Sequence, residues 1–223
     1  MPEISSAQVK ICGIRDATSA LAANEAGATA IGFMLAPSRR QIDPSTVREI
    51  LDRLPAARPR TVGVVINEPA ETLRRLFADS WLDVIQLSGD EEPSILDELP
   101  VRTWKALRFP LGTDSDTARR SIDPWFDHPR PVEAVLIDAS VPGRYGGTGH
   151  VADWALAAEL AREYPLILAG GLTPETVAAA IDVVRPFGVD VSSGVESNGA
   201  KDPVRIRAFV AAALATFASI HVS

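Results

Sequence analysis

The chain has 223 residues, of which 46% are hydrophobic and 23% are charged, and its formal net charge is −7 at pH 7. The composition is typical of a globular protein, and the acidic excess argues against nucleic-acid binding, which needs a basic surface. A single cysteine excludes an internal disulfide and a multi-cysteine zinc site, and no apolar run approaches the roughly 18 residues of a membrane span, so we expect no membrane partner.

The first residues, Met1-Pro2-Glu3-Ile4, lack the basic and apolar regions of a signal peptide, so we expect a cytoplasmic protein. Eight short runs rich in β-branched residues follow, as expected of buried parallel strands. These predicted strands are 9–13, 30–34, 61–66, 83–87, 102–107, 132–138, 165–169 and 189–192.

Segments rich in alanine and leucine, with helical spacing, separate the strands. They are 17–25, 46–54, 70–77, 114–122, 155–163, 176–184 and 204–218. Proline after a polar residue marks several helix starts, including one after the fourth strand, because proline suits the first helical position. These pairs are Asp43-Pro44, Glu68-Pro69, Glu92-Pro93, Thr173-Pro174 and Asp202-Pro203.

Counted together, the elements predict eight strand–helix units without a linker between them. This pattern favours an α/β fold, a (β/α)8 TIM barrel with eight parallel strands, formed by residues 1–223 as a single domain. The alternative is a doubly wound open sheet. That fold normally has fewer strands and a GxGxxG turn after the first strand, which the sequence Cys12-Gly13-Ile14-Arg15-Asp16 does not match.

In a barrel, functional residues gather where the strands end. The sixth strand ends in Asp138, before a glycine-dense loop at 139–149, which is typical of either a catalytic acid or a capping aspartate. The first strand ends in Cys12, which is either a small buried hydrophobe or, as thiolate, a general base. By strand alternation Lys10 shares the face of Cys12, and we expect its ammonium to lower the thiol pKa. Asp190 on the eighth strand is expected to pair with Lys10.

Two turns of small residues follow the seventh and eighth strands: Gly170-Gly171 and Ser192-Ser193-Gly194. Barrels often bind phosphate at this position through backbone amides, which glycine leaves accessible. The alternative is a pair of ordinary tight turns. Arg40, after the second strand, is suited to hold a carboxylate in a bidentate fork, whereas Arg39 is interpreted as a surface charge. The histidines 128, 150 and 221 show no metal-ligand spacing, so we expect no metal.

Taken together, these residues resemble the phosphoribosylanthranilate isomerase family of tryptophan biosynthesis. The matching stretches fall in order along nearly the whole chain. They are Val9-Lys10-Ile11-Cys12-Gly13, Ser38-Arg39-Arg40, Val62-Gly63-Val64-Val65, Gln86-Leu87-Ser88-Gly89-Asp90-Glu91, Gly146-Gly147-Thr148-Gly149, Leu168-Ala169-Gly170-Gly171-Leu172 and Asp190-Val191-Ser192-Ser193-Gly194-Val195-Glu196.

The resemblance implies a cofactor-independent Amadori rearrangement of N-(5-phosphoribosyl)anthranilate to 1-(2-carboxyphenylamino)-1-deoxyribulose 5-phosphate. It implies that Asp138 is the general acid, that Cys12 is the general base, and that Arg40 holds the anthranilate carboxylate. It implies that the turns at Gly170-Gly171 and Ser193-Gly194, with glycines of the sixth loop such as Gly147, hold the phosphate. We predict Asp190 and Ser192 as further substrate-binding residues. The family usually has histidine where this chain has Ser88. We expect that this histidine only orients the substrate and that serine can do the same with a modest loss of activity.

The sequence leaves several alternative functions open. Indole-glycerol-phosphate synthase would use a lysine acid, for which Lys105 is the candidate, and a ribulose-phosphate epimerase would need clustered metal ligands. An isomerase that also accepts the aminoimidazole substrate of histidine biosynthesis and a non-catalytic phosphosugar-binding paralogue are the others. The sequence is compatible with a monomer or a homodimer.

Overall fold

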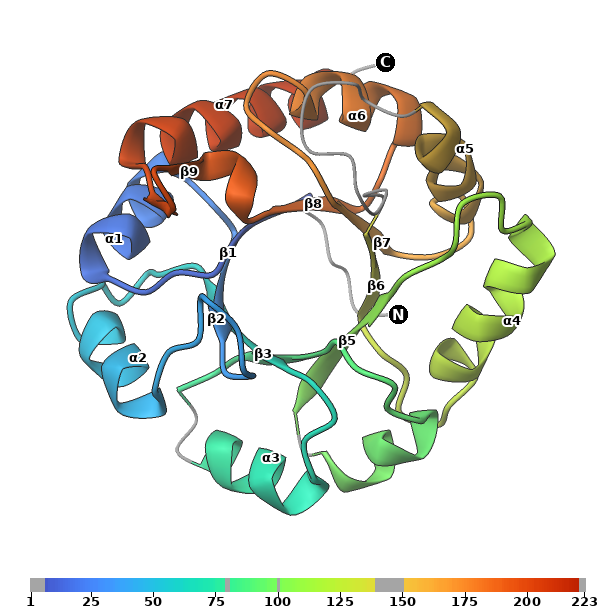
Figure 1. Cartoon of the computed structure of the whole chain (residues 1–223), viewed down its shortest axis with the longest axis horizontal. Helices are drawn as coiled ribbons and strands as arrows, with labels where there is room; N and C mark the ends of the chain where they lie inside the picture. Colours follow the sequence, from blue (N-terminus) through green and yellow to red (C-terminus); the bar gives the residue numbers. More distant parts are fainter. Residues whose placement is uncertain (1–6, 79–80, 100, 139–150, 221–223) are drawn as a thin grey trace.

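Eight parallel strands close into a barrel in the computed structural model (Figure 1). The structure describes residues 7–78, 81–99, 101–138 and 151–220, with the backbone alone at 151–153. The strands are β1 (Gln8–Cys12), β2 (Ala30–Met34), β3 (Arg60–Val65), β4 (Val84–Leu87), β5 (Arg102–Leu107), β6 (Ala134–Asp138), β7 (Leu166–Ala169) and β8 (Gly188–Val191). Each pairs with the next, and β8 pairs with β1. The predicted (β/α)8 fold is confirmed, and the doubly wound sheet is excluded.

Seven α-helices of the described chain lie outside the ring of strands (Figure 1). They are α1 (Ala17–Ala26), α2 (Pro44–Leu51), α3 (Ala70–Ala78), α4 (Ser115–Phe126), α5 (Val151–Leu160), α6 (Val177–Val184) and α7 (Pro203–Ile220). Pro44 and Pro203 begin their helices, as predicted, because the missing amide of proline is not needed there.

The helix predicted after the fourth strand is a short 3-10 helix, η1 (Pro93–Glu98), rather than an α-helix. Its proline start is as predicted, but the chain meets a second proline at position 100. A proline disfavours helical backbone angles in the residue that precedes it. Accordingly, Leu99 is extended, with φ −97° and ψ 124°. Too few residues remain for stable α-helical turns.

Two apolar cores hold the barrel together. One fills the space between the strands and the outer helices, and the smaller one fills the interior of the barrel. The interior core consists of Ala30, Val62, Val84, Trp104, Ala134, Leu136, Ile167 and Ala169. Since side chains alternate along a strand, these positions identify which other residues face inward.

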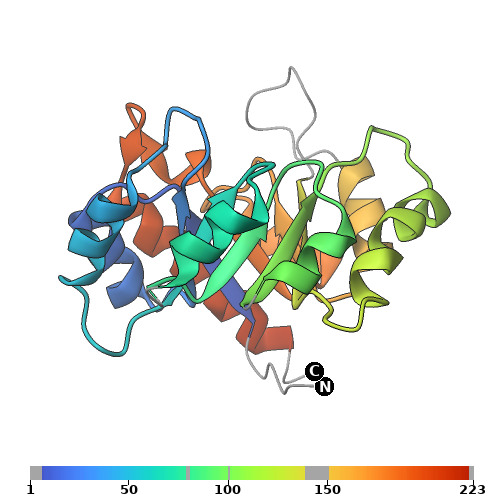
Figure 2. The same cartoon turned by 90° about the horizontal axis from the view of Figure 1, so that it is seen from below.

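The loops that follow the strands gather at one end of the barrel (Figure 2). After β8 the chain forms a single 3-10 turn, η2 (Ser193–Val195), and the short hairpin β9 (Glu196–Ser197) and β10 (Ala200–Lys201). The carboxyl ends of all the strands point to this end, which is where barrel enzymes bind their substrates.

Helix α7 is long and apolar enough to cross a membrane by length and composition alone. The expectation that no segment approaches this length is therefore wrong, because the helix is apolar enough on average although it contains the two arginines at 205 and 207. A core helix of a globular protein passes the same test. In this barrel α7 buries Ile206, Phe209, Val210, Ala213 and Phe217 and packs beside α1 and α6, so we interpret it as an outer barrel helix.

Candidate active site

Cys12 lies at the carboxyl end of β1 with 6% of its surface exposed. Its partner in register on β2 is Gly32. A Cβ atom at Gly32 would lie 2.9 Å from Lys10 Cε and 3.0 Å from Cys12 Sγ. The glycine therefore leaves space in which both side chains lie on the inner face, as the alternation along the strand predicts.

The predicted ion pair between Lys10 and Asp190 is confirmed. The two residues are in register across β1 and β8, and Lys10 Nζ lies 2.9 Å from Asp190 Oδ1. Lys10 is completely buried. Burial lowers the pKa of Lys10, but the charges of Asp190 and Cys12 outweigh that effect and leave the pKa raised. A buried ammonium is thus held charged at the centre of the barrel.

The pKa of the Cys12 thiol is raised, contrary to the expectation from Lys10 alone. Burial disfavours the thiolate most strongly and raises the pKa, while the Lys10 ammonium lowers it without compensating fully. Asp190 adds a further raising effect. Without substrate, the thiol is therefore protonated at neutral pH, and a general base at this position needs an additional positive charge nearby.

Asp138 is the last residue of β6, and its side chain is 27% exposed. It follows Ala134 and Leu136 on the inner face and pairs in register with Ala169 of β7. Arg108 Nε lies 3.7 Å from Asp138 Oδ2. Asp138 is therefore placed at the mouth of the barrel, while Gly147 and the rest of the loop that follows lie outside the described residues.

The turns after β7 and β8 pack against each other, as predicted. Gly170 and Gly171 have φ angles of 90° and 65°, which favour glycine. A Cβ atom at Gly194 would lie 1.8 Å from the carbonyl oxygen of Leu172, so no other residue fits that contact. The geometry brings Gly170, Gly171, Ser192, Ser193 and Gly194 together at one side of the mouth.

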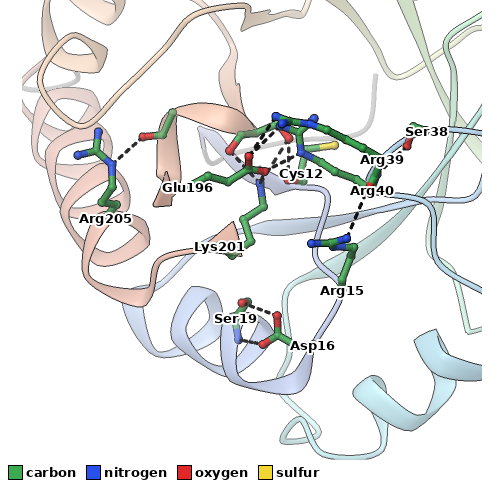
Figure 3. Close-up of polar contacts among 12 residues, drawn as sticks. Cys12, Arg15, Asp16, Ser19, Ser38, Arg39, Arg40, Glu196, Lys201 and Arg205 are labelled. Atoms are coloured by element: carbon green, nitrogen blue, oxygen red, sulfur yellow. Dashed lines mark hydrogen bonds and ion pairs between the residues drawn. The ribbon is translucent and has the colours of Figure 1, made fainter. Parts of the chain in front are cut away.

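An ionic cluster around Glu196 lies beside Cys12 and was not predicted (Figure 3). Arg40 binds this carboxylate with two hydrogen bonds, Nε to Oε1 at 2.6 Å and Nη2 to Oε2 at 3.0 Å. Lys201 Nζ lies 3.0 Å from Oε1, and Arg39 Nη2 lies 3.2 Å from Oε2. Burial raises the pKa of Glu196, but the bonds from Arg40 and Lys201 outweigh it and lower the pKa to about 2.

This cluster connects the ends of β1, β2 and β8. Lys201 donates to the Ser192 carbonyl oxygen at 2.8 Å, and Ser192 Oγ donates to the Cys12 carbonyl oxygen at 3.2 Å. Arg40 crosses directly over Gly13, where a Cβ atom would lie 2.6 Å from Arg40 Cδ. The cluster therefore fixes the turn after Cys12 and the guanidinium of Arg40 relative to each other.

Lys105 faces away from the interior of the barrel. Trp104 beside it belongs to the interior core, so Lys105 points outward by alternation. Its ammonium binds the Gly89 carbonyl oxygen at 2.6 Å and Glu91 Oε2 at 2.7 Å, and lies 5.0 Å from the centre of the Trp125 ring. Lys105 is therefore not placed to act as an acid on a substrate inside the barrel.

Within the described ranges, no group of three or more His, Cys, Asp or Glu side chains is arranged to hold a metal ion. His128 lies in a turn, where its Nδ1 accepts from the Arg130 amide at 3.1 Å. The histidines at 150 and 221 lie outside the described residues. The clustered ligands that the epimerase alternative needs are not found in this part of the chain.

A closed parallel barrel with carboxylate, thiol and ion-pairing side chains at the carboxyl ends of its strands defines a (β/α)8-barrel enzyme. The family model for N-(5'-phosphoribosyl)anthranilate (PRA) isomerase matches residues 9–212. The isomerase of Roseiflexus castenholzii is 50% identical over 214 residues, which cover 93% of this chain and 98% of that protein. The chain belongs to the N-(5'-phosphoribosyl)anthranilate isomerase family.

Solved structures agree with this membership. The phosphoribosyl anthranilate isomerase of Thermotoga maritima superposes with a TM-score of 0.79 at 37% identity, covering 93% of this chain and 98% of that one. A second phosphoribosyl anthranilate isomerase structure, in complex with reduced 1-(o-carboxyphenylamino)-1-deoxyribulose 5-phosphate, superposes with a TM-score of 0.76 at 34% identity. It covers 93% of this chain and 98% of that one.

Proposed function

We propose that residues 1–223 form one catalytic domain that rearranges N-(5-phosphoribosyl)anthranilate, with Asp138 as general acid and Cys12 as general base. Membership of the family makes the chain an isomerase of tryptophan biosynthesis. The observation that carries the proposal is that Cys12 ends β1 and Asp138 ends β6 on the inner face of one barrel mouth. Such a pair suits a reaction of two proton transfers.

Asp138 acts in the first step. Its carboxyl group gives a proton to the ring oxygen of the ribose, and the bond between that oxygen and C1 breaks. The lone pair of the anthranilate nitrogen forms the iminium as the ring opens. The partial exposure of Asp138 supports this role, because the carboxylate can regain a proton from solvent after each turnover.

Cys12 acts in the second step, as a thiolate that takes the proton from C2. The electron pair of the C–H bond moves into the iminium, and the resulting enolamine becomes the ketone when C1 gains a proton and the C2 hydroxyl group loses one. The iminium carries the positive charge that the buried thiol needs, so substrate itself counteracts the raised pKa of Cys12. The iminium is also the electron sink, and we propose that the reaction uses no cofactor.

The two charged ends of the substrate suit two groups of residues at the mouth. Arg40 stands after β2 and is held rigidly by Glu196, which preorganises it for the anthranilate carboxylate. The packed turns at Gly170-Gly171 and Ser192-Ser193-Gly194 are suited to the phosphate, with Gly147 of the loop after Asp138 as a further contact. Asp190 is suited to a ribosyl hydroxyl.

Arg40→Ala is expected to raise KM by about ten- to a hundredfold, with a smaller effect on kcat. This is the loss of affinity expected when a hydrogen bond between charged groups is removed. Arg39→Ala is the matched control, since Arg39 binds the same Glu196 but its side chain is 64% exposed. Steady-state kinetics on both variants give the answer. Equal KM values in the two variants would contradict a carboxylate-binding role for Arg40.

Asp190→Asn is expected to shift the acidic limb of the kcat/KM profile to lower pH. The carboxylate of Asp190 contributes to raising the pKa of Cys12, so its removal lowers the pH at which the thiolate forms. Asp190→Glu keeps the charge and should keep the limb near its original position. A limb that does not move in Asp190→Asn would show that this ion pair does not act on the thiol.

The proposed function is tested by mixing the protein with N-(5-phosphoribosyl)anthranilate and following the loss of anthranilate-type fluorescence. Enzyme-dependent loss is the expected result. Binding without loss would favour the non-catalytic paralogue, and turnover only of phosphosugars without an anthranilate group would favour another barrel enzyme. The aminoimidazole substrate of histidine biosynthesis, assayed in parallel, tests the bifunctional alternative. Light scattering distinguishes the monomer from the homodimer.

A further inference from the structure

Gln86 places a buried amide group just below the mouth of the barrel. It lies on β4 and pairs in register with Val64 and Trp104, the second of which belongs to the interior core. On the same face of the strand, Val84 below it is fully buried and Ser88 above it is partly exposed. Gln86 is 5% exposed, so it lies between the apolar interior and the open end.

The two ends of this amide differ in their hydrogen bonding. Gln86 Nε2 donates to Ser88 Oγ at 3.1 Å. Gln86 Oε1 is buried and finds no hydrogen-bond partner within the described part of the chain. A buried carbonyl oxygen left without a donor destabilises a protein, and few such atoms are kept. The unpaired oxygen is therefore suited to a donor that arrives from outside.

A second buried glutamine shows the ordinary arrangement. Gln8 on β1 is 3% exposed, and its Oε1 accepts a hydrogen bond from Thr29 Oγ1 at 3.4 Å. The two residues are both buried glutamines on strands of the barrel, Gln8 at the amino end of β1 and Gln86 near the carboxyl end of β4. They differ in that the oxygen of Gln8 is satisfied by the protein, whereas the oxygen of Gln86 is not.

We propose that Gln86 is a further substrate-binding residue, whose Oε1 accepts a hydrogen bond from the uncharged middle of phosphoribosylanthranilate. This inference rests on the proposed function. The carboxylate and the phosphate at the two ends of the substrate only accept hydrogen bonds, so neither can satisfy a carbonyl oxygen. The anilino N–H and the ribosyl hydroxyls are the donors between them. The bond from Nε2 to Ser88 fixes the amide and leaves its oxygen available to such a donor.

The test is Gln86→Met, which keeps the length of the side chain and removes the acceptor. Affinity for reduced 1-(o-carboxyphenylamino)-1-deoxyribulose 5-phosphate should fall by about tenfold, the value of one neutral hydrogen bond at the upper end of its range. The melting temperature should stay level or rise, because the variant no longer buries an unpaired oxygen. Inorganic phosphate should inhibit the variant and the wild type equally.

Gln8→Met is the matched control. It should lower the melting temperature, since it removes the hydrogen bond from Thr29 Oγ1 to Gln8 Oε1 and leaves that hydroxyl only the Val9 carbonyl oxygen as an acceptor. It should leave affinity for the reduced product analogue unchanged. The inference is overturned if Gln86→Met binds the analogue as tightly as the wild type, or if it behaves as Gln8→Met does. A wild-type protein that neither binds the analogue nor consumes phosphoribosylanthranilate would instead overturn the proposed function.

Discussion

Replacing Cys12 by serine is expected to lower kcat by roughly 10²- to 10⁴-fold, the usual cost of removing a general base. A serine hydroxyl is far less acidic than a thiol, so it does not form the anion that takes the C2 proton. Fluorescence-monitored turnover measures the loss. The substitution nearly preserves volume at a site that is 6% exposed, so a thermal melt close to that of the wild type should accompany it. Full activity in Cys12→Ser would contradict the assignment.

The same assignment predicts the pH dependence of the wild-type enzyme. Because the thiolate is the active form and burial raises the thiol pKa, kcat/KM should rise with pH through the neutral and mildly alkaline range. In Cys12→Ser this limb should disappear. A profile that keeps its limb in the variant would place the titrating group elsewhere.

Asp138→Asn is the second substitution with a large expected effect, also roughly 10²- to 10⁴-fold in kcat. The amide has nearly the shape of the carboxyl group but carries no proton acidic enough to open the ribose ring. KM should change much less than kcat, since the charged ends of the substrate bind elsewhere.

The control for Asp138 is the same substitution at an exposed position. Asp182 lies on α6 with its side chain exposed, so Asp182→Asn should leave kcat at the wild-type value. If both variants retain wild-type turnover, the acid is a different group. If only Asp138→Asn loses activity, the effect belongs to the barrel mouth.

Strand periodicity was sufficient to predict much of the site geometry. Because side chains alternate along a strand and strands one and eight are neighbours in a closed barrel, residues 180 positions apart were expected to meet, and Lys10 lies 2.9 Å from Asp190. The neighbouring turns after β7 and β8 follow from the same closure. The three lysines each prove to be buried in an ion pair, with Asp190, Glu91 and Glu196 as their partners.

Other features depend on quantities that a sequence does not contain. The sign of the Cys12 pKa shift depends on how deeply the thiol is buried, and burial outweighs the nearby ammonium. The Glu196 cluster joins side chains from loops after different strands, and Arg40 and Glu196 are 156 positions apart without a shared strand register. The unpaired oxygen of Gln86 is visible only once every neighbouring donor has been placed.

The most direct test of the proposed roles is the kinetic isotope effect on kcat/KM with phosphoribosylanthranilate that carries deuterium at C2 of the ribose. If Cys12 removes that proton, Cys12→Ser makes this step slower and should enlarge the isotope effect. If Asp138 opens the ring, Asp138→Asn makes the earlier step limiting and should abolish it. An isotope effect that grows in Asp138→Asn and vanishes in Cys12→Ser would contradict both assignments.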